Sequence, residues 1–499
     1  MNKEKKSRRG RAKKKDKQPA VFVPGSAAGP AIFDCDKIAS DPSLYWETGD
    51  GDNFLVESKR GENGSTERTW NRWPKEAVKM LLREKHCIAL AAREGERTGD
   101  FDRVILHVRQ NRIVDLSTHS IAGYTAGLHN SLGRSILVRR SSPVIEPKQG
   151  DCSLYRTLIE SRLNLDDGAE TPGPQQAVFF YAWLRASLES RLNGKPGQWR
   201  PGQILVLAGD SGCGKSLIQH FVITPILGGR SANPESYLFG GTDFNAELAA
   251  AEHLLMEDPA TSTRDIDRIH FGEKLKQMAV AYTFRMHRKR EDAVPVEPFF
   301  RLSISVNNDP DKLRVLPLLT PDFKEKLMLF LVSDDPIPFE LDTMTQRTEF
   351  TRKMKEQAPA FAWWLLNEFE IPAAMRHKRY GVRQWLHPGL AQGLFDDTPA
   401  AELLAIIDAA RWTDAVMGEL ALWQLDSRWG KSGETWGDSG MELQRLLEDS
   451  TFNHDAARLL RYYRIERLLS RLAKDEPDRV MHHRTGMQRG WSVAPPASE

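Results

Sequence analysis

The chain has 499 residues, which allows about three domains of roughly 150 residues each. Hydrophobic residues make up 40% of it and charged residues 28%, as in an ordinary soluble protein. The formal net charge is only +2, so the overall charge does not indicate which partner the protein binds. No stretch reaches the roughly 18 uncharged apolar residues that a membrane helix needs, so we expect no membrane partner.

The amino terminus and the cysteines both indicate a cytoplasmic protein. The amino terminus is basic, but no apolar stretch follows its charges, so it does not resemble a secretory signal. The cysteines lie far apart and form no C-x-x-C pair, which indicates reduced thiols and no disulfide framework or zinc site. They are Cys35, Cys87, Cys152 and Cys213.

Residues 1–30 are predicted to be a disordered basic tail. Cations crowd its first half, repel one another and attract phosphate groups, although a tail that only improves solubility is an equal alternative. The cations are Lys3, Lys5, Lys6, Arg8, Arg9, Arg11, Lys13, Lys14, Lys15 and Lys17.

Residues 31–150 are predicted to form a small mixed α/β domain. The short stretches 53–57 and 103–108 suggest strands, and residues 75–84 have the apolar spacing of a helix. Residues 151–200 are predicted to be a helical connector, with helices over 154–163 and 177–192.

Residues 201–340 are predicted to form an α/β domain with a parallel sheet, because apolar strands alternate with helices there. The aliphatic run 204–207 has the unalternating pattern of a buried parallel strand. The motif G-x-x-x-x-G-K-[ST] follows it and precedes a helix that begins near Lys215, which is the context of a phosphate-binding loop. The motif consists of Gly209, Asp210, Ser211, Gly212, Cys213, Gly214, Lys215 and Ser216.

The chemistry of such a loop (a P-loop) predicts ATP and Mg²⁺ as its ligands. Glycines let successive N–H groups face the phosphates, and the helix amino terminus adds its positive end. Lys215 would reach the β- and γ-phosphates, and the Ser216 hydroxyl would bind Mg²⁺. We therefore expect an ATPase, or a hydrolase of another nucleoside triphosphate.

Two further strands are predicted to end in polar residues of the same site. An apolar run at 253–256 leads into Glu257 and Asp258, of which one would hold the Mg²⁺ shell and the other would orient or deprotonate water. A third strand, 300–306, leads into Asn307, which could position the water or sense the γ-phosphate. Solvated turns are the alternative at both places.

These three elements, in this order, resemble those of the superfamily three helicases, which are hexameric AAA+ ATPases of viruses, plasmids and mobile elements. The phage-type primase-helicases are most similar. The resemblance covers residues 201–340 well, and residues 151–200 and a helical lid at 341–395 more loosely. It implies that Lys215, Ser216, Glu257, Asp258 and Asn307 have the Walker A, Walker B and sensor roles in a homo-hexameric ring.

The family also has a β-hairpin before the sensor strand, whose basic tip binds single-stranded DNA inside the ring. His287, Arg288, Lys289 and Arg290 occupy that position here, and a solvated basic turn is the alternative. Relatives often have paired arginines where this chain has Glu325 and Lys326. Lys326 is thus the candidate for the cation that reaches a neighbouring subunit's nucleotide, with Arg314 as its substitute, or hydrolysis is slow.

The family also raises the possibility of primer synthesis. A primase needs paired carboxylates on a strand, with a histidine nearby. Asp100 and Asp102 with His107 are the best candidates, and Asp50 and Asp52 the next, but neither pair follows a hydrophobic strand. We therefore interpret residues 31–150 as a degenerate or accessory replication domain, with a separate primase or replication protein as a possible partner.

Residues 396–440 are predicted to be a linker or helical segment, and residues 441–499 a winged-helix-like DNA-binding domain. A helix over 454–473, followed by two strands at 479–484 and 490–493, suits that fold. Its arginines recur every three or four residues and would contact duplex DNA, unless they form only a solvated face. The candidate contacts are Arg461, Arg464 and Arg467.

The sequence thus predicts an ATP-dependent DNA helicase or replication ATPase of a phage, plasmid or other mobile element, acting as a ring. An alternative is a DNA-binding initiator or defence-associated regulator, in which the nucleotide controls assembly without processive unwinding. A kinase is a further alternative, although no motif indicates a second substrate pocket.

Overall fold

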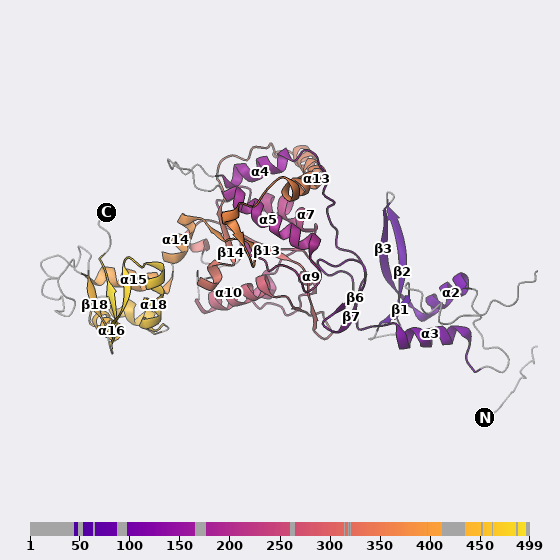
Figure 1. Cartoon of the computed structure of the whole chain (residues 1–499), viewed down its shortest axis with the longest axis horizontal. Helices are drawn as coiled ribbons and strands as arrows, with labels where there is room; N and C mark the ends of the chain where they lie inside the picture. The colour runs from indigo at the N-terminus through magenta and orange to yellow at the C-terminus, as the bar shows by residue number, and fades with distance from the viewer. Residues whose placement is uncertain are drawn as a thin grey trace, which may run out of the picture. The chain divides into compact units, whose positions relative to one another are not determined.

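The fold is taken from a computed structural model (Figure 1), which describes residues 44–47, 53–62, 65–86, 97–164, 176–259, 265–313, 315–317, 319, 321–396, 398–411, 435–450, 453–461, 463–485 and 488–495. The predicted basic tail and the candidates Asp50, Asp52 and Arg314 lie outside these residues. None of the helices described is long and apolar enough to cross a membrane. The chain divides into two units, residues 1–56 with 72–113, and residues 57–71 with 114–499.

The described residues between 44 and 114 contain a small sheet with the strand order β3-β2-β1-β4, and those of the first unit add two helices. The elements are β1 (Leu44–Glu47), β2 (Asn53–Glu62), β3 (Ser65–Pro74), α2 (Lys75–His86), α3 (Asp100–Asn111) and β4 (Ile113–Val114). The strand at 53–57 and the helix at 75–84 are therefore confirmed. Residues 57–71, the far part of the β2–β3 hairpin, are grouped with the second unit.

The predicted strand at 103–108 is wrong, because these residues lie in α3. Phe101, Val104, Ile105 and Val108 are buried, and their spacing of three and four residues places them on one face of a helix. That spacing outweighs the strand preference of the β-branched side chains. Asp100 and Asp102 both lie in the first turn of α3, two residues apart, where side chains do not face each other.

The second unit is built on a six-stranded parallel sheet with the order β17-β14-β8-β13-β10-β9. Its strands are β8 (Ile204–Ala208), β9 (Ser231–Ala232), β10 (His253–Glu257), β13 (Arg301–Val306), β14 (Leu327–Leu331) and β17 (Trp385–Leu386). The predicted strands at 204–207, 253–256 and 300–306 are confirmed, and so is the predicted parallel sheet.

Alternate residues of strand β8, in the middle of the sheet, face two separate hydrophobic layers. Leu205 and Leu207 pack with helices α4 (Ser153–Leu163), α5 (Gln176–Asn193) and α13 (Met344–Asn367), which gather on one side of β13 and β14 in Figure 1. Ile204 and Val206 pack in the other layer, which includes α10 (Asp265–Val280). The strand is buried on both faces, which explains why its sequence is aliphatic throughout.

A small sheet with the order β5-β7-β6 belongs to this second unit as well. Its strands are β5 (Leu116–Thr118), β6 (Gly127–Ser131) and β7 (Arg134–Val138). Ser142, which follows β7, donates a hydrogen bond of 2.5 Å to the buried carboxylate of Glu252, and Glu252 also binds Arg230. The sequence places a domain boundary at residue 150, whereas in the structure residues 114–142 pack against the parallel-sheet core.

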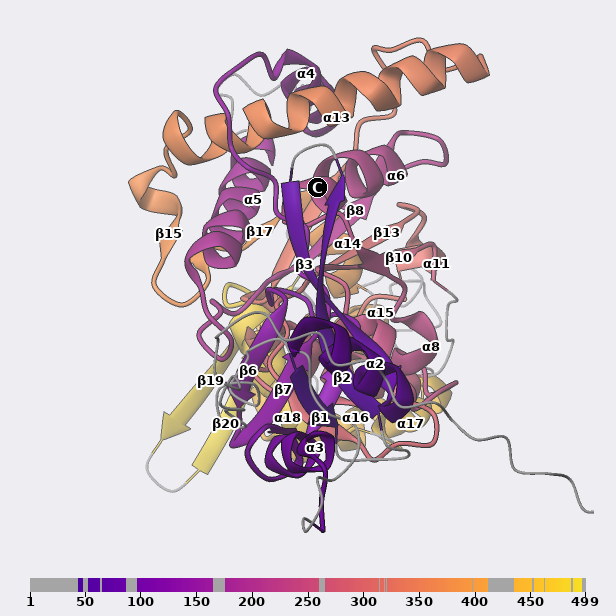
Figure 2. The ribbon, with the colours of Figure 1, turned by 90° about the vertical axis from the view of Figure 1, so that its right-hand side faces the viewer.

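The predicted helical lid at 341–395 is helical at its two ends and in one short 3-10 turn, η2 (Ala373–Met375), between them. The long helix α13 and the short helix α14 (Pro388–Asp396) flank three two-residue strands, β15 (Arg376–His377), β16 (Gly381–Val382) and β17. Figure 2 shows α13 lying across α4 and α5. The middle of this region has no α-helix because β17 pairs with β14 and extends the central sheet.

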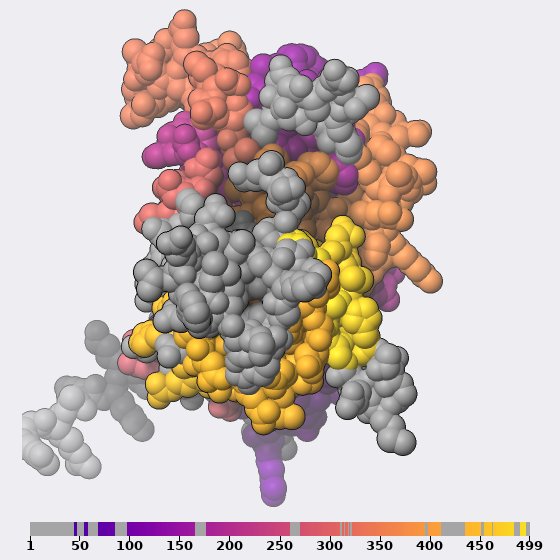
Figure 3. Space-filling model, turned by 90° about the vertical axis from the view of Figure 1, so that its left-hand side faces the viewer, coloured from indigo at the N-terminus to yellow at the C-terminus, as the bar shows by residue number. Residues whose placement is uncertain are grey.

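The C-terminal part of the chain has a hydrophobic core of its own. Figure 3 shows its surface in orange-yellow and yellow. Its described residues form four helices and an antiparallel sheet with the order β18-β20-β19. The elements are α15 (Pro399–Arg411), β18 (Trp436–Asp438), α16 (Gly440–Glu448), α17 (Asn453–Leu460), α18 (Ile465–Asp475), β19 (Val480–Thr485) and β20 (Gln488–Val493).

Both predicted C-terminal strands are confirmed, but the predicted single helix at 454–473 is wrong. It consists of α17 and α18, which a break after Leu460 separates. The break occurs where Ile465 and Leu468 begin a new buried face. Arg467 therefore lies on α18, Arg464 is its N-cap residue, and Arg461 lies between the helices.

Candidate functional site

The P-loop connects β8 to a helical segment that begins at Lys215, as predicted. Gly212 and Gly214 have φ angles of 82° and 99°, in the left-handed region that favours glycine. The helical segment consists of α6 (Lys215–Leu217), the π-helical turn η1 (Ile218–Ile223) and α7 (Thr224–Leu227). The glycines thus allow the tight turn that points this helix terminus at the carboxyl edge of the sheet.

The side chain of Lys215 is held inside the loop. Its ammonium donates hydrogen bonds of 2.7 Å to the carbonyl oxygen of Gly209 and 2.8 Å to that of Asp210. A third bond, of 3.3 Å, goes to the side-chain oxygen of Asn307. The structure therefore brings together the predicted phosphate-binding lysine and the predicted sensor amide, which lie 92 residues apart in the sequence.

The two predicted carboxylates face different surroundings. Asp258 lines the same cavity as Lys215 and Ser216, and its φ of 41° is unusual for a residue other than glycine. Glu257 lies 3.3 Å from the Nε2 atom of His220. The structure thus places Asp258, but not Glu257, in the lining of the cavity.

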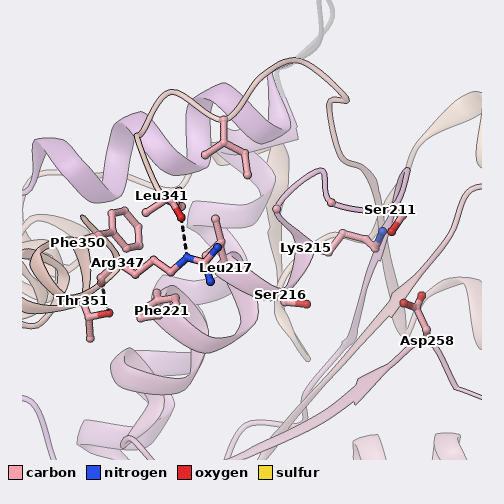
Figure 4. Close-up of a pocket in the computed structure, with 13 residues that line it drawn as sticks. Ser211, Lys215, Ser216, Leu217, Phe221, Asp258, Leu341, Arg347, Phe350 and Thr351 are labelled. Atoms are coloured by element: carbon pink, nitrogen blue, oxygen red, sulfur yellow. Dashed lines mark hydrogen bonds between the residues drawn. The ribbon is translucent and has the colours of Figure 1, made fainter. Parts of the chain in front are cut away.

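The cavity beside the P-loop has a volume of about 510 Å³ (Figure 4). Its lining joins the P-loop and Asp258 to residues of α13 and of the segment before it. The residues that sequence reasoning missed are Leu217, Phe221, Ile337, Leu341, Arg347, Phe350 and Thr351. They belong to no sequence motif, and residues of the same types occur in helices and loops throughout the sequence, so no pattern marked them as part of a site.

Arg162 is a further residue that the sequence did not reveal. The residue is 1% exposed, and its guanidinium donates to the carbonyl oxygens of Cys213, Ser333, Asp335 and Pro336 at 3.4, 3.2, 2.6 and 3.1 Å. Arg162 therefore connects the P-loop to the segment that leads into the far wall of the cavity.

The donor set at the P-loop suits Mg²⁺. Among the residues described, no group of three or more His, Cys, Asp or Glu side chains could hold a metal ion. Mg²⁺ needs no such group here, because it usually binds one or two carboxylates together with substrate phosphates and water. The exposed hydroxyl of Ser216 and the carboxylate of Asp258 would supply the protein ligands. Burial raises the pKa of the Cys213 thiol, which disfavours the thiolate form of this P-loop cysteine.

Lys326 lies at the amino end of β14, the opposite edge of the sheet from the P-loop. Its side chain is 10% exposed and binds the carbonyl oxygen of Asp322 and, at 3.2 Å, the carboxylate of Glu325. Glu325 also lies 3.5 Å from Arg379, which is 52% exposed. A role of Lys326 across a subunit boundary stays a prediction.

The predicted DNA-binding hairpin consists of β11 (Phe284–Met286) and β12 (Val294–Val296). Lys289 and Arg290 lie exposed at its tip. Arg288, in contrast, binds Glu291 at 2.9 Å and the carbonyl oxygen of Ser117 at 3.0 Å.

Asn245 holds the base of this hairpin. Its side chain donates to the carbonyl oxygen of Arg285 at 3.0 Å and accepts from the N–H of His287 at 2.8 Å. The neighbouring ring of Phe244 is 46% exposed and lies 5.1 Å from the ring of His287. Two aromatic rings therefore lie next to the basic tip.

The three predicted C-terminal contacts, Arg461, Arg464 and Arg467, are all exposed. Two further arginines of the same region bind carboxylates. Arg458 binds Glu402 at 2.6 Å, and Arg479 binds Asp408 at 2.7 Å.

Comparisons with known proteins add a fold but no established activity. A family model described as a family of unknown function, DUF5906, matches residues 207–316, which contain the P-loop, Asp258 and Asn307. No curated protein matches the chain.

Solved structures of the C-terminal region of NrS-1 (residues 305–718) are similar over nearly the whole chain. The apo structure has a TM-score of 0.53 at 11% identity and covers 93% of this chain and 98% of that one. A second form, the A form, has a TM-score of 0.51 at 11% identity, covering 93% and 99%. A structure titled SCCmec type IV Cch, active helicase, has a TM-score of only 0.29 at 10% identity, covering 87% and 73%. The chain thus has the fold of the NrS-1 C-terminal region.

Proposed function

We propose that the protein is an ATP-hydrolysing enzyme that acts on DNA as an oligomeric ring, as a helicase or replication ATPase of a phage, plasmid or other mobile element. The observation that carries the ATPase part is the convergence of Lys215, Ser216, Asp258 and Asn307 at the carboxyl edge of one parallel sheet. Ligands bind at this edge in α/β folds.

Each of these side chains has a distinct task. Lys215 would exchange its contacts with the loop carbonyls for the β- and γ-phosphates, and Asn307, already 3.3 Å from it, would orient the attacking water or the γ-phosphate. Bound Mg²⁺ would neutralise charge on the phosphates. Asp258 and Ser216 would hold that ion, and Glu257 would accept the proton of the water after leaving His220.

The β11–β12 hairpin supports an action on single-stranded DNA. Lys289 and Arg290 can neutralise phosphates, and the rings of Phe244 and His287 offer a surface on which bases stack. In a ring, several such tips would surround one strand. Lys326 would complete the site of a neighbouring subunit once Glu325 releases it.

The C-terminal part supports a second contact, with duplex DNA. A winged helix is supported by its order of helices and strands, with a three-stranded sheet in the order β18-β20-β19. Arg464 and Arg467 at the start of α18 would then contact phosphates or the major groove.

The test compares ATP turnover with and without single-stranded DNA, measures particle size with ATP, and follows strand displacement on a forked duplex. We expect DNA-stimulated turnover, ATP-dependent oligomers and displacement, all abolished in Lys215→Ala. ATP-dependent assembly without displacement would instead favour a nucleotide-gated initiator. A mixture of Lys326→Ala and Lys215→Ala subunits should recover some turnover, because a few junctions regain both groups.

A further inference from the structure

The cavity beside the P-loop has two chemically different halves (Figure 4). One half, formed by the P-loop and Asp258, is polar and suits phosphates with a cation. The other half begins one residue beyond Ser216 and is mainly apolar, with two polar side chains. It is lined by Leu217, Phe221, Ile337, Leu341, Phe350, Arg347 and Thr351. A nucleotide has the same two parts, so the apolar half has the surroundings that a base requires.

Arg347 is fixed at the edge of this apolar half. Its Nε atom donates a 2.6 Å hydrogen bond to the carbonyl oxygen of Leu341, and Figure 4 shows the guanidinium between Leu341 and Leu217. Among the residues described, its two Nη groups have no hydrogen-bond partner. They are therefore free to donate to a ligand.

Arg347 lies where the helix dipole of α13 adds to its positive charge. Thr343 is the N-cap residue of α13, and Arg347 lies within the first turns, near the positive end of the helix dipole. The first turn contains no acidic residue that would compensate. A cation in this place strengthens the local positive potential, which favours an acceptor atom of a ligand.

The guanidinium of Arg347 can only donate, so it recognises acceptor atoms of a base. The hydroxyl of Thr351 already donates to the carbonyl oxygen of Arg347 at 2.8 Å in the adjoining turn of the helix, as Figure 4 shows for these two residues. Of the described residues that line this half, none carries a carboxylate or a carboxamide that would accept from the amino group of adenine. Adenine and guanine share the acceptor N7, which pyrimidines lack, and guanine adds the neighbouring acceptor O6, which arginine can bind together with N7.

We propose that Arg347 donates to N7 of a purine base, so that the site takes both adenine and guanine nucleotides and disfavours pyrimidine nucleotides. The inference rests on the proposed nucleotide site, and it assigns the base specificity of that site to α13. It predicts that recognition depends on one atom of the base rather than on the amino group that distinguishes adenine.

The test measures equilibrium binding of nucleoside diphosphates to the full chain, which avoids hydrolysis. We expect GDP, which offers O6 beside N7, to bind at least as tightly as ADP, and CDP and 7-deaza-ADP, which lacks only the N7 acceptor, to bind about 10-fold more weakly than ADP. Arg347→Ala should weaken ADP about 10-fold and bring it level with 7-deaza-ADP. Arg352→Ala, on the same helix but outside the cavity, should keep the wild-type pattern.

Equal binding of ADP and 7-deaza-ADP by the wild-type protein would overturn the inference. An unchanged preference of Arg347→Ala for ADP over 7-deaza-ADP would overturn it too. So would an equal loss of affinity for all nucleotides in Arg347→Ala, which would place Arg347 at the phosphates. In these cases the P-loop assignment stands. Absence of binding of any nucleoside diphosphate or triphosphate would overturn the proposed function as well.

Discussion

The ammonium of Lys215 lies 3.3 Å from the side-chain oxygen of Asn307, so a side-chain hydrogen bond joins the P-loop after β8 to the end of the neighbouring strand β13. A ligand that draws Lys215 towards its phosphates must change this contact. The pair can therefore couple the binding of the γ-phosphate to the strand that follows the hairpin.

Asn307→Ala should lower the rate of hydrolysis about 100-fold, because loss of one positioned polar group at a reacting phosphate has an effect of this order. Affinity for ADP should change by less than about 3-fold, since ADP lacks the γ-phosphate. Asn308→Ala, at the next position, is the control. Normal turnover by Asn307→Ala would show that the residue is only part of a turn.

Asp258→Asn and Glu257→Gln should each stop hydrolysis, because Asp258 would hold Mg²⁺ at the cavity and Glu257 would accept the proton of the water after leaving His220. We expect a loss of at least about 100-fold for Asp258→Asn, with nucleotide binding still measurable. The measurement is single-turnover hydrolysis at several Mg²⁺ concentrations. Normal hydrolysis by Glu257→Gln would show that Glu257 stays with His220 and takes no part in the reaction.

The sequence predicted the parts of this site that depend on adjacent residues. The P-loop needs glycines at fixed positions, and each polar residue that follows a buried strand must emerge at the same edge of a parallel sheet. Arg162 and Arg347 were not predictable in this way, because each reaches the site from a separate helix through tertiary packing. No local pattern distinguishes them from other arginines.

The errors in secondary structure have related causes. The run that contains Val104, Ile105 and Val108 has the composition of a strand, but its burial has helical spacing. The region after α13 has no strong strand pattern, yet Trp385 and Leu386 pair with β14. In both places the packing partner decides the structure, and the partner is distant in sequence.

Arg162→Met should destabilise the parallel-sheet unit by about 3 kcal/mol or more, because several carbonyl oxygens lose a buried donor. Arg162→Lys should recover part of this stability but not full ATP turnover, since an ammonium cannot span the P-loop and Asp335 as a guanidinium does. Urea denaturation and hydrolysis rates would be measured together. Arg156→Met, on the exposed side of the same helix, is the control. Wild-type behaviour of Arg162→Met would contradict the connecting role.

Acid should destabilise the parallel-sheet unit through His253. Burial lowers the pKa of this imidazole from 6.5 to about 3, and its nitrogens contact the hydroxyls of Thr224 and Ser303 at 2.6 and 2.7 Å. The unfolded chain binds a proton below pH 6.5 and the folded chain does not until about pH 3, so stability falls as the pH falls through this window. The slope contributed by His253 approaches about 1.4 kcal/mol per pH unit.

The measurement is the urea midpoint between about pH 7.5 and 4.5, which brackets the unfolded pKa of histidine. His253→Gln should be less stable at neutral pH but should show a shallower decline towards acid, whereas exposed His270→Gln should keep the wild-type slope. An unchanged slope in His253→Gln would show that other groups dominate acid unfolding.

The two proposed DNA contacts, the tip of the β11–β12 hairpin and the C-terminal arginines, should differ in how they depend on ATP and on salt concentration. The double variant Lys289→Ala, Arg290→Ala should lose strand displacement and keep basal ATP hydrolysis. The reason is that these exposed cations would contact DNA only in the assembled ring. Arg288 is left in place because its bonds to Glu291 and Ser117 support the hairpin. Normal displacement by the double variant would exclude the hairpin as the DNA contact.

Alanine at Arg461, Arg464 and Arg467 should instead weaken duplex binding without nucleotide. A plot of log affinity against log salt concentration should become less steep by about 0.9 for each arginine–phosphate interaction that the substitutions remove, because each such interaction releases bound counterions. Arg458→Ala is a matched control, since Arg458 binds Glu402 at 2.6 Å and should contribute little to DNA binding. A triple variant with the wild-type slope would show that the three arginines form only a solvated surface, and the duplex-binding surface would then have to lie elsewhere in the chain.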